Sequence, residues 1–117
     1  MALEIGEEQA GETLVIAPRG RVDSVSSDEL ERHVVARLDK GARRVVIDMG
    51  GVEYISSAGL RVLLLAAKRL KPPRGVLVLC GLGPSVRIVL ELAGFMSLFA
   101  VEPGREQALA RASGGAP

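Results

Sequence analysis

The chain has 117 residues and a formal net charge of +1, and 48% of its residues are hydrophobic. This length suits a single domain with one hydrophobic core. The near-neutral charge argues against nucleic acid as the main partner, and the lack of Trp, with only 3% aromatic residues, argues against a stacking platform for bases or sugars. The N-terminal segment does not resemble a signal peptide, and no apolar run approaches the roughly 20 residues that cross a bilayer. We therefore expect a cytoplasmic protein without a membrane segment.

The first part of the chain predicts a hairpin followed by a helix. Residues 3–9 and 13–20 have the composition of two strands joined by a short turn. The helix is expected to begin at Ser26, whose hydroxyl would cap it together with Glu29 in a capping box. The buried face of this helix is marked by apolar residues that repeat every four positions, namely Leu30, Val34 and Leu38.

Strands and helices then alternate to the end of the chain. Strands are predicted in the stretches RRVVIDM, GVLVLCG and SLFAVE, and helices over residues 57–70, 84–93 and 104–112. The order ββαβαβαβα predicts an α/β fold with a mixed, mostly parallel β-sheet and packed helices, since strands separated by helices need crossover connections. We expect a single domain over residues 1–112 and a disordered tail over 113–117. The expected core includes Ile47, Leu64, Val78 and Leu90.

The stretch EYISSAGLRVLL joins a strand to a helix through two adjacent serines. The loop over residues 48–59 follows the carboxyl end of a central strand, where sites are usually found in open α/β sheets. Gly50 and Gly51 would let it turn sharply, and Val52 and Ile55 would anchor it to the core with the serines at the rim.

A hydroxyl at a helix N-terminus has two possible roles. It can cap the helix by accepting a backbone N–H, or it can accept a phosphate that the free N–H groups and the helix dipole would favour. Phosphorylation would add about −1.5 to −2 charge and could break a protein contact without unfolding the helix. The residues alone leave both roles open.

The remaining polar candidates have simpler interpretations. Asp23 stands where the second strand gives way to a helix and suits a turn carboxylate. His33 has no second His or Cys with which to bind a metal, so a surface or boundary position is expected. Cys80 ends an apolar strand and is expected to be buried and unreactive. Ser26 and Ser27 suit capping better than nucleophilic catalysis, and the stretch GLGPS lacks the spacing of a nucleotide loop, so we expect no metal and no cofactor.

The stretch VVIDMGGVEYISSAGLRVLL resembles the central motif of STAS domains, the family of anti-sigma factor antagonists. The stretch GRVD resembles the family's strand-to-helix motif, and LAGFMSLFAVEPGREQALA resembles its C-terminal region. The resemblance covers about residues 13–110 and implies the STAS fold. Gly59 and Leu60 match the family's Gly-Leu pair, so Ser57 matches the phosphoserine. Ser56 stands where the best-known members have Asp, which makes it a second candidate acceptor or a cap.

The resemblance implies a protein that is not an enzyme and binds a serine-kinase anti-sigma factor. Phosphorylation by that kinase would switch it off, and a serine phosphatase would restore it. The implied partner-binding residues are Asp23, Ser56, Ser57 and Gly59. The alternatives are a non-phosphorylated STAS adaptor subunit of a transporter or signalling assembly, and a small α/β enzyme that would use Asp23, Asp48 and Ser57.

Overall fold

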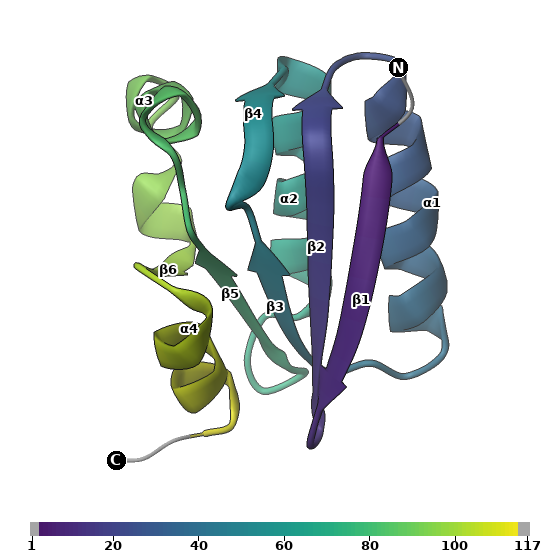
Figure 1. Ribbon diagram of the computed structural model, residues 1–117. Helices are drawn as coiled ribbons and strands as arrows, with labels where there is room; N and C mark the ends of the chain where they lie inside the picture. The colour runs from purple at the N-terminus through teal and green to yellow at the C-terminus, as the bar shows by residue number, and fades with distance from the viewer. Residues whose placement is uncertain (1–2, 115–117) are drawn as a thin grey trace.

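The computed structural model describes residues 3–114 (Figure 1). The elements follow one another as β1 (Glu4–Ala10), β2 (Thr13–Val22), α1 (Ser26–Asp39), β3 (Arg44–Asp48), β4 (Gly51–Ile55), α2 (Ser57–Arg69), β5 (Val76–Cys80), α3 (Pro84–Leu92), a 3-10 turn (Met96–Leu98), β6 (Ala100–Glu102) and α4 (Arg105–Ala112).

The strands form one mixed, mostly parallel sheet, as predicted. Its order is β1-β2-β3-β5-β6, and β4 pairs with β2 beside this path. Among the described strands only β1 and β2 pair antiparallel, as the predicted hairpin, and the pairings of β2 with β3, β3 with β5 and β5 with β6 are parallel. Of the stretch SLFAVE, only the last three residues form a strand, because the residues before them turn in the 3-10 segment.

The segment between β3 and α2 differs from the prediction. Residues 48–59 were expected to form a loop, but Gly51–Ile55 form β4, so the order is ββαββαβαβα. β3 pairs with the first half of β2, and β4 pairs parallel with its second half, from Arg19 to Val22. Because β2 is ten residues long, its second half would leave backbone groups unpaired without this extra strand.

A β-bulge explains why β4 lacks the alternation of an ordinary strand. Gly20 is paired with Val52 and Arg21 with Tyr54, so Glu53 is an extra residue without a partner on β2. The bulge lets Val52 and Ile55 both face the core although they are three positions apart, and both are buried as expected. Gly51 lies close to β2, since a Cβ there would stand 2.8 Å from Arg19 Cγ. Close approach, rather than a left-handed turn, is what requires this glycine.

The helices cover the two faces of the sheet unequally. α1 and α2 lie together behind the sheet in Figure 1, over the larger core cluster. On the opposite face, α4 covers a smaller cluster through Ala108 and Ala112, and the strand residues of this cluster are Val15, Val46, Val78 and Cys80.

The expected core is confirmed at three of its four positions. Ile47, Val78 and Leu90 are fully buried. The expectation for Leu64 is wrong: it is only half-buried, and the neighbouring Leu63 is fully buried. The inward face of α2 follows Leu60, Leu63, Ala66 and Leu70, and this three- and four-residue spacing turns Leu64 toward the rim of the sheet.

Two features near the chain ends complete the fold. Ser113 and Gly114 form a turn that follows α4, and residues 115–117, the rest of the expected disordered tail, lie outside the described residues. No helix within residues 3–114 is both long and apolar enough to cross a membrane.

Candidate functional site

The pairing of β2 with β4 brings two segments together at one corner of the sheet. Val22 and Ile55, the last residues of these strands, are register partners, and the backbone N–H of Ser56 donates to the carbonyl oxygen of Val22 across 2.8 Å. Asp23 therefore follows β2 at the same corner where Ser56 and Ser57 follow β4. This corner lies at the carboxyl end of parallel strands, as expected for a site in an α/β sheet.

Ser56 caps α2. Its backbone is extended, and its Oγ accepts a hydrogen bond from the backbone N–H of Gly59 at 3.2 Å. The side chain is partly buried. This arrangement is the usual one for an N-cap serine, so the capping role is filled by Ser56.

Ser57 is the first residue of α2 and its side chain is exposed. Within residues 3–114, its hydroxyl has no hydrogen-bond partner, whereas Ser56 is used by the cap. The first turn of α2 contains no acidic residue, and Arg61 stands one helical turn further on the same side. An anionic group on Ser57 would therefore meet the positive end of the helix without a competing carboxylate in that turn.

Gly59 lies beneath this surface. It is buried, and a Cβ at this position would stand 2.7 Å from Cγ1 of both Val22 and Ile55. The start of α2 thus packs directly on the last residues of β2 and β4. Gly59 allows this close approach, which holds Ser57 at the edge of the sheet.

Asp23 organises the other half of the corner. Its Oδ1 accepts hydrogen bonds from the backbone N–H groups of Val25 (3.0 Å) and Ser26 (2.8 Å). Hydrogen bonds from the Ser26 backbone and side chain lower the pKa of the Asp23 carboxyl below its ordinary value. Asp23 is therefore a charged turn carboxylate, as the sequence suggested.

The predicted capping box at Ser26 is wrong. Ser26 lies inside α1, after the cap position Val25, and its Oγ accepts from the Asp23 N–H (3.0 Å) and donates to the Arg21 carbonyl (2.7 Å). Asp23 caps α1 instead, because a carboxylate two or three residues ahead of a helix reaches its first free N–H groups. Ser27 donates to the Ser24 carbonyl and is buried like Ser26, so both serines serve the local structure.

Two exposed apolar side chains near the corner were not predicted from the sequence. Val25 at the start of α1 is 79% exposed, and Tyr54 on β4 is 38% exposed. The Arg21 guanidinium lies 4.4 Å from the centre of the Tyr54 ring, a cation–π contact between neighbouring strands. A hollow of about 730 Å³ is bordered by Arg21, Asp23 and Glu53, among others. The exposure of Tyr54 could not be predicted from the sequence, because the bulge breaks the alternation of inward and outward residues along β4.

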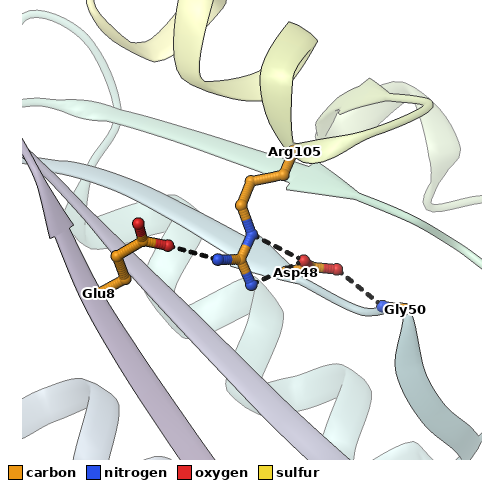
Figure 2. Close-up of polar contacts among 4 residues, drawn as sticks. All are labelled: Glu8, Asp48, Gly50 and Arg105. Atoms are coloured by element: carbon orange, nitrogen blue, oxygen red, sulfur yellow. Dashed lines mark hydrogen bonds and ion pairs between the residues drawn. The ribbon is translucent and has the colours of Figure 1, made fainter.

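Asp48 does not belong to this corner. Its Oδ2 accepts from Nε and Nη2 of Arg105, both at 3.0 Å, and its Oδ1 accepts from the Gly50 N–H at 2.9 Å. Figure 2 shows Arg105 reaching from α4 to Asp48 and to Glu8 on β1. Asp48 thus faces the α4 side of the sheet, and the structure does not bring Asp23, Asp48 and Ser57 together as the enzyme alternative requires.

The last two candidate residues, His33 and Cys80, lie outside the corner. His33 is half-buried at the boundary between α1 and the sheet, where its Nε2 contacts the Glu7 carboxylate. Cys80 is buried, as expected, and burial with the nearby Asp48 charge raises the pKa of its thiol to about 11. Among residues 3–114 no cluster of His, Cys, Asp or Glu could hold a metal ion.

Comparisons with known proteins agree with this fold. The STAS domain model matches residues 5–108, so the chain belongs to the STAS domain family. It is 52% identical over 97 residues to BtrV of Bordetella bronchiseptica, which is provisionally named an anti-sigma factor antagonist, and the match covers 83% of this chain and 84% of BtrV.

Solved structures show the same architecture. An anti-sigma factor antagonist from Mycobacterium paratuberculosis matches with a TM-score of 0.88 and 25% identity, over 96% of this chain and 95% of that chain. SpoIIAA in its unphosphorylated form matches with a TM-score of 0.80 and 20% identity, over 97% of this chain and 100% of that chain. The phosphorylated form of Bacillus SpoIIAA matches with a TM-score of 0.70 and 20% identity, over 94% and 98%.

Proposed function

We propose that this chain is an anti-sigma factor antagonist that binds a serine-kinase anti-sigma factor and is switched off by phosphorylation of Ser57. The observation that supports the proposal most strongly is that the two serines have different roles. Ser56 is partly buried and caps α2, whereas Ser57 is exposed at the helix N-terminus with an unused hydroxyl. The similarity to BtrV, whose name assigns it this class of function, supports the same conclusion.

The partner-binding surface in this proposal is the corner formed by the ends of β2 and β4. Asp23, Ser56 and Ser57 present polar groups there, and Gly59 holds the helix start in place from below. The bound partner would supply the catalytic groups and ATP, and this chain would supply only the acceptor hydroxyl. The Ser57 hydroxyl oxygen would form a bond to the γ-phosphorus of ATP, ADP would leave, and the hydroxyl proton would pass to a base of the kinase. The proposal places the protein in the cytoplasm, without direct contact to nucleic acid or a membrane.

Phosphorylation would act on the interface and leave the fold intact. The added charge of about −1.5 to −2 would be accepted by the free N–H groups at the start of α2. The same dianion would disturb a partner surface that fits a neutral hydroxyl, and binding would weaken. Removal of the phosphate by a serine phosphatase would restore the binding form.

Ser56 departs from the aspartate of the family's best-known members. An aspartate at this position would cap α2 and also add a negative charge next to the acceptor. Ser56 keeps the cap and removes the charge, so the cognate kinase must recognise this corner without that charge. Arg21, Tyr54 and Val25 are the neighbouring exposed side chains that could contribute to its specificity.

The test first identifies the partner kinase and then locates the phosphate that it transfers. The tagged chain is purified from its native cells, the bound proteins are identified, and the kinase among them is expressed alone. The kinase and ATP are then incubated with the unaltered chain and with the Ser57→Ala and Ser56→Ala variants, and phosphate is located by mass spectrometry. We expect phosphate on Ser57 in the unaltered chain and in Ser56→Ala, and none in Ser57→Ala.

Binding measurements complete the test. Ser57→Ala should bind the kinase as the unaltered chain does, and Ser57→Asp should bind at least tenfold more weakly with an unchanged melting temperature. Phosphate on Ser56 alone would move the switch by one residue. Co-purification of transport or scaffold subunits, with no phosphate on either serine, would overturn the proposal in favour of the adaptor alternative.

A further inference from the structure

A hollow of about 820 Å³ lies at the amino ends of β3 and β5, at the opposite end of the sheet from Ser57. Its walls are the turn between α1 and β3, the loop before β5, and the end of the β1–β2 hairpin. These segments meet at the bottom of Figure 1, whereas α2 begins at the top. We call this feature the basic hollow, after the five basic residues that line it: Arg37, Lys40, Arg43, Arg44 and Arg74.

The basic hollow concentrates positive charge in a chain that has almost none overall. It holds five of the 15 basic residues and, at Glu12, one of the 14 acidic residues. The rest of the chain therefore carries ten basic and 13 acidic residues, an excess of acid. Like charges gathered in this way repel one another, so their presence around a concave surface points to an anionic occupant.

Most of these cations also lack a carboxylate partner. Within residues 3–114, other arginines form ion pairs, such as Arg69 with Asp39 at 2.8 Å and Arg111 with Glu102 at 2.8 Å. In the basic hollow, Arg37 has such a partner, since its Nε lies 3.5 Å from a Glu7 oxygen. No carboxylate of the described residues lies within 4.0 Å of the charged nitrogens of the other four, Lys40, Arg43, Arg44 and Arg74.

The wall of the basic hollow is held in place by backbone contacts. Arg43 Nε donates to the Arg74 carbonyl oxygen at 2.9 Å, and the Val76 N–H donates to the Arg43 carbonyl oxygen at 2.8 Å. A Cβ on Gly75 would stand only 2.4 Å from that same Arg43 oxygen, so glycine is needed for the two loops to touch. On the other side, Arg44 Nη1 donates to the Ser113 carbonyl oxygen at 2.8 Å. Two guanidinium groups are thus oriented by carbonyl groups and remain available to an anion.

We propose that the basic hollow binds a small anion that carries two or more phosphate groups. Guanidinium groups bind phosphate oxygens in pairs, and several of them around one cavity suit a ligand with several phosphates better than a single sulfate or chloride. The volume lies within the range of about 300–1,000 Å³ that is usual for small-molecule sites. The loops are already joined to each other, so binding would need little ordering of the chain.

The probe for this proposal is inorganic tripolyphosphate, titrated into the protein by calorimetry at constant ionic strength. The test variant is Lys40→Gln combined with Arg74→Gln, because both side chains are exposed and their loss should leave the fold intact. The matched control is Arg87→Gln, an exposed arginine on α3, at the other end of the molecule. We expect saturable binding of one tripolyphosphate, at least tenfold weaker binding by the double variant, and a change of less than twofold in the control.

Three results would overturn the proposal. The first is the absence of saturable binding, and the second is equal weakening by Arg87→Gln, which would indicate a general charge effect. The third is tighter binding of an oligoglutamate peptide than of tripolyphosphate, which would assign the basic hollow to an acidic segment of a partner protein. Unchanged melting temperatures of the variants would exclude unfolding as the cause of weaker binding. The Ser57→Asp variant should bind tripolyphosphate like the unaltered chain, so this proposal stands or falls independently of the proposed function.

Discussion

The backbone N–H of Ser56 donates to the carbonyl oxygen of Val22 across 2.8 Å, and this bond joins the two halves of the candidate site. It is the last contact of the β2–β4 ladder, placed where both strands end. Asp23 follows one strand and Ser57 the other, so their relative position depends on strand register. Any change that shifts β4 against β2 would therefore move the acceptor serine away from the Asp23 turn.

The different roles of the two serines can be separated by stability measurements. Ser56→Ala removes the acceptor for the Gly59 N–H and should lower the free energy of unfolding by about 0.5–2 kcal/mol. Ser57→Ala removes an exposed hydroxyl and should change it by less than about 0.5 kcal/mol. Urea denaturation of both variants, followed by circular dichroism, checks this. A larger loss for Ser57→Ala would show that the cap is assigned to the wrong residue.

Gly59→Ala should destabilise the protein although alanine favours helices. The new methyl group would meet Val22 and Ile55 at 2.7 Å, and overpacking of this kind costs about 1–3 kcal/mol, against a gain of up to about 1 kcal/mol in helix propensity. Gly83→Ala is the control for steric overlap, because Gly83 is the N-cap of α3 and a Cβ there meets nothing within 4 Å. It should lower the unfolding free energy by less than about 1 kcal/mol, the cost of exchanging glycine for alanine at an N-cap. Equal effects of the two changes would contradict the close packing of α2.

The contact of Arg105 with Asp48 should couple α4 to the sheet. Two guanidinium nitrogens lie 3.0 Å from one oxygen of a carboxylate that is 21% exposed. A double-mutant cycle with Arg105→Gln and Asp48→Asn should give a coupling energy of about 1 kcal/mol that falls at high salt. The same cycle with Glu8→Gln should give less than about 0.5 kcal/mol, because the Glu8 side chain is 57% exposed and makes a single contact. A larger coupling for Glu8 would reverse this ranking.

Cys80 should make stability depend on pH in the alkaline range. Burial, together with the Asp48 charge, raises the pKa of its thiol from 9.0 to about 11. The folded state therefore keeps the proton at a pH at which the unfolded chain loses it. The protonated thiol therefore contributes fully to the free energy of unfolding below pH 9. As the pH rises from 9 to 11 this contribution is lost, and the free energy of unfolding falls by about 2–3 kcal/mol at most.

Denaturation of the unaltered chain and of Cys80→Ala at several pH values isolates this contribution, since other titrating groups are common to both. The stability advantage of the unaltered chain over the variant should shrink between pH 9 and 11. Thiol reagents should also label Cys80 slowly in the folded protein and quickly in urea. A pH-independent difference together with rapid labelling of the folded protein would show that the thiol is accessible.

Much of the fold could be predicted because its signals are local. Apolar residues four positions apart marked the inward face of α1, and the β-branched runs marked β3 and β5. The burial of Cys80 also follows from a short stretch of sequence, and the serine pair at the start of α2 predicts a cap without deciding which serine provides it. Each of these features depends on hydrogen bonds or periodicity within a few residues of the chain.

Other features depended on contacts between distant segments. β4 exists because the second half of β2 needs a partner, and its bulge removes the alternation that would have revealed it. Leu63, rather than Leu64, faces the core because the contacts of α2 with the sheet select one of two adjacent leucines for its inward face. Asp23, rather than Ser26, caps α1 because the end of β2 places the Asp23 carboxylate over the first free N–H groups of the helix.

The same distinction applies to the two sites. The sequence by itself determined that a serine pair begins a helix after a strand, and that one serine would cap it. Only the tertiary structure decided that Ser57 is exposed beside the Asp23 turn, that Gly59 is buried beneath it, and that five basic residues from two separate segments surround one hollow. The physical reason is that capping is a contact between residues three positions apart, whereas exposure and charge clustering depend on which distant strands pair and in which register.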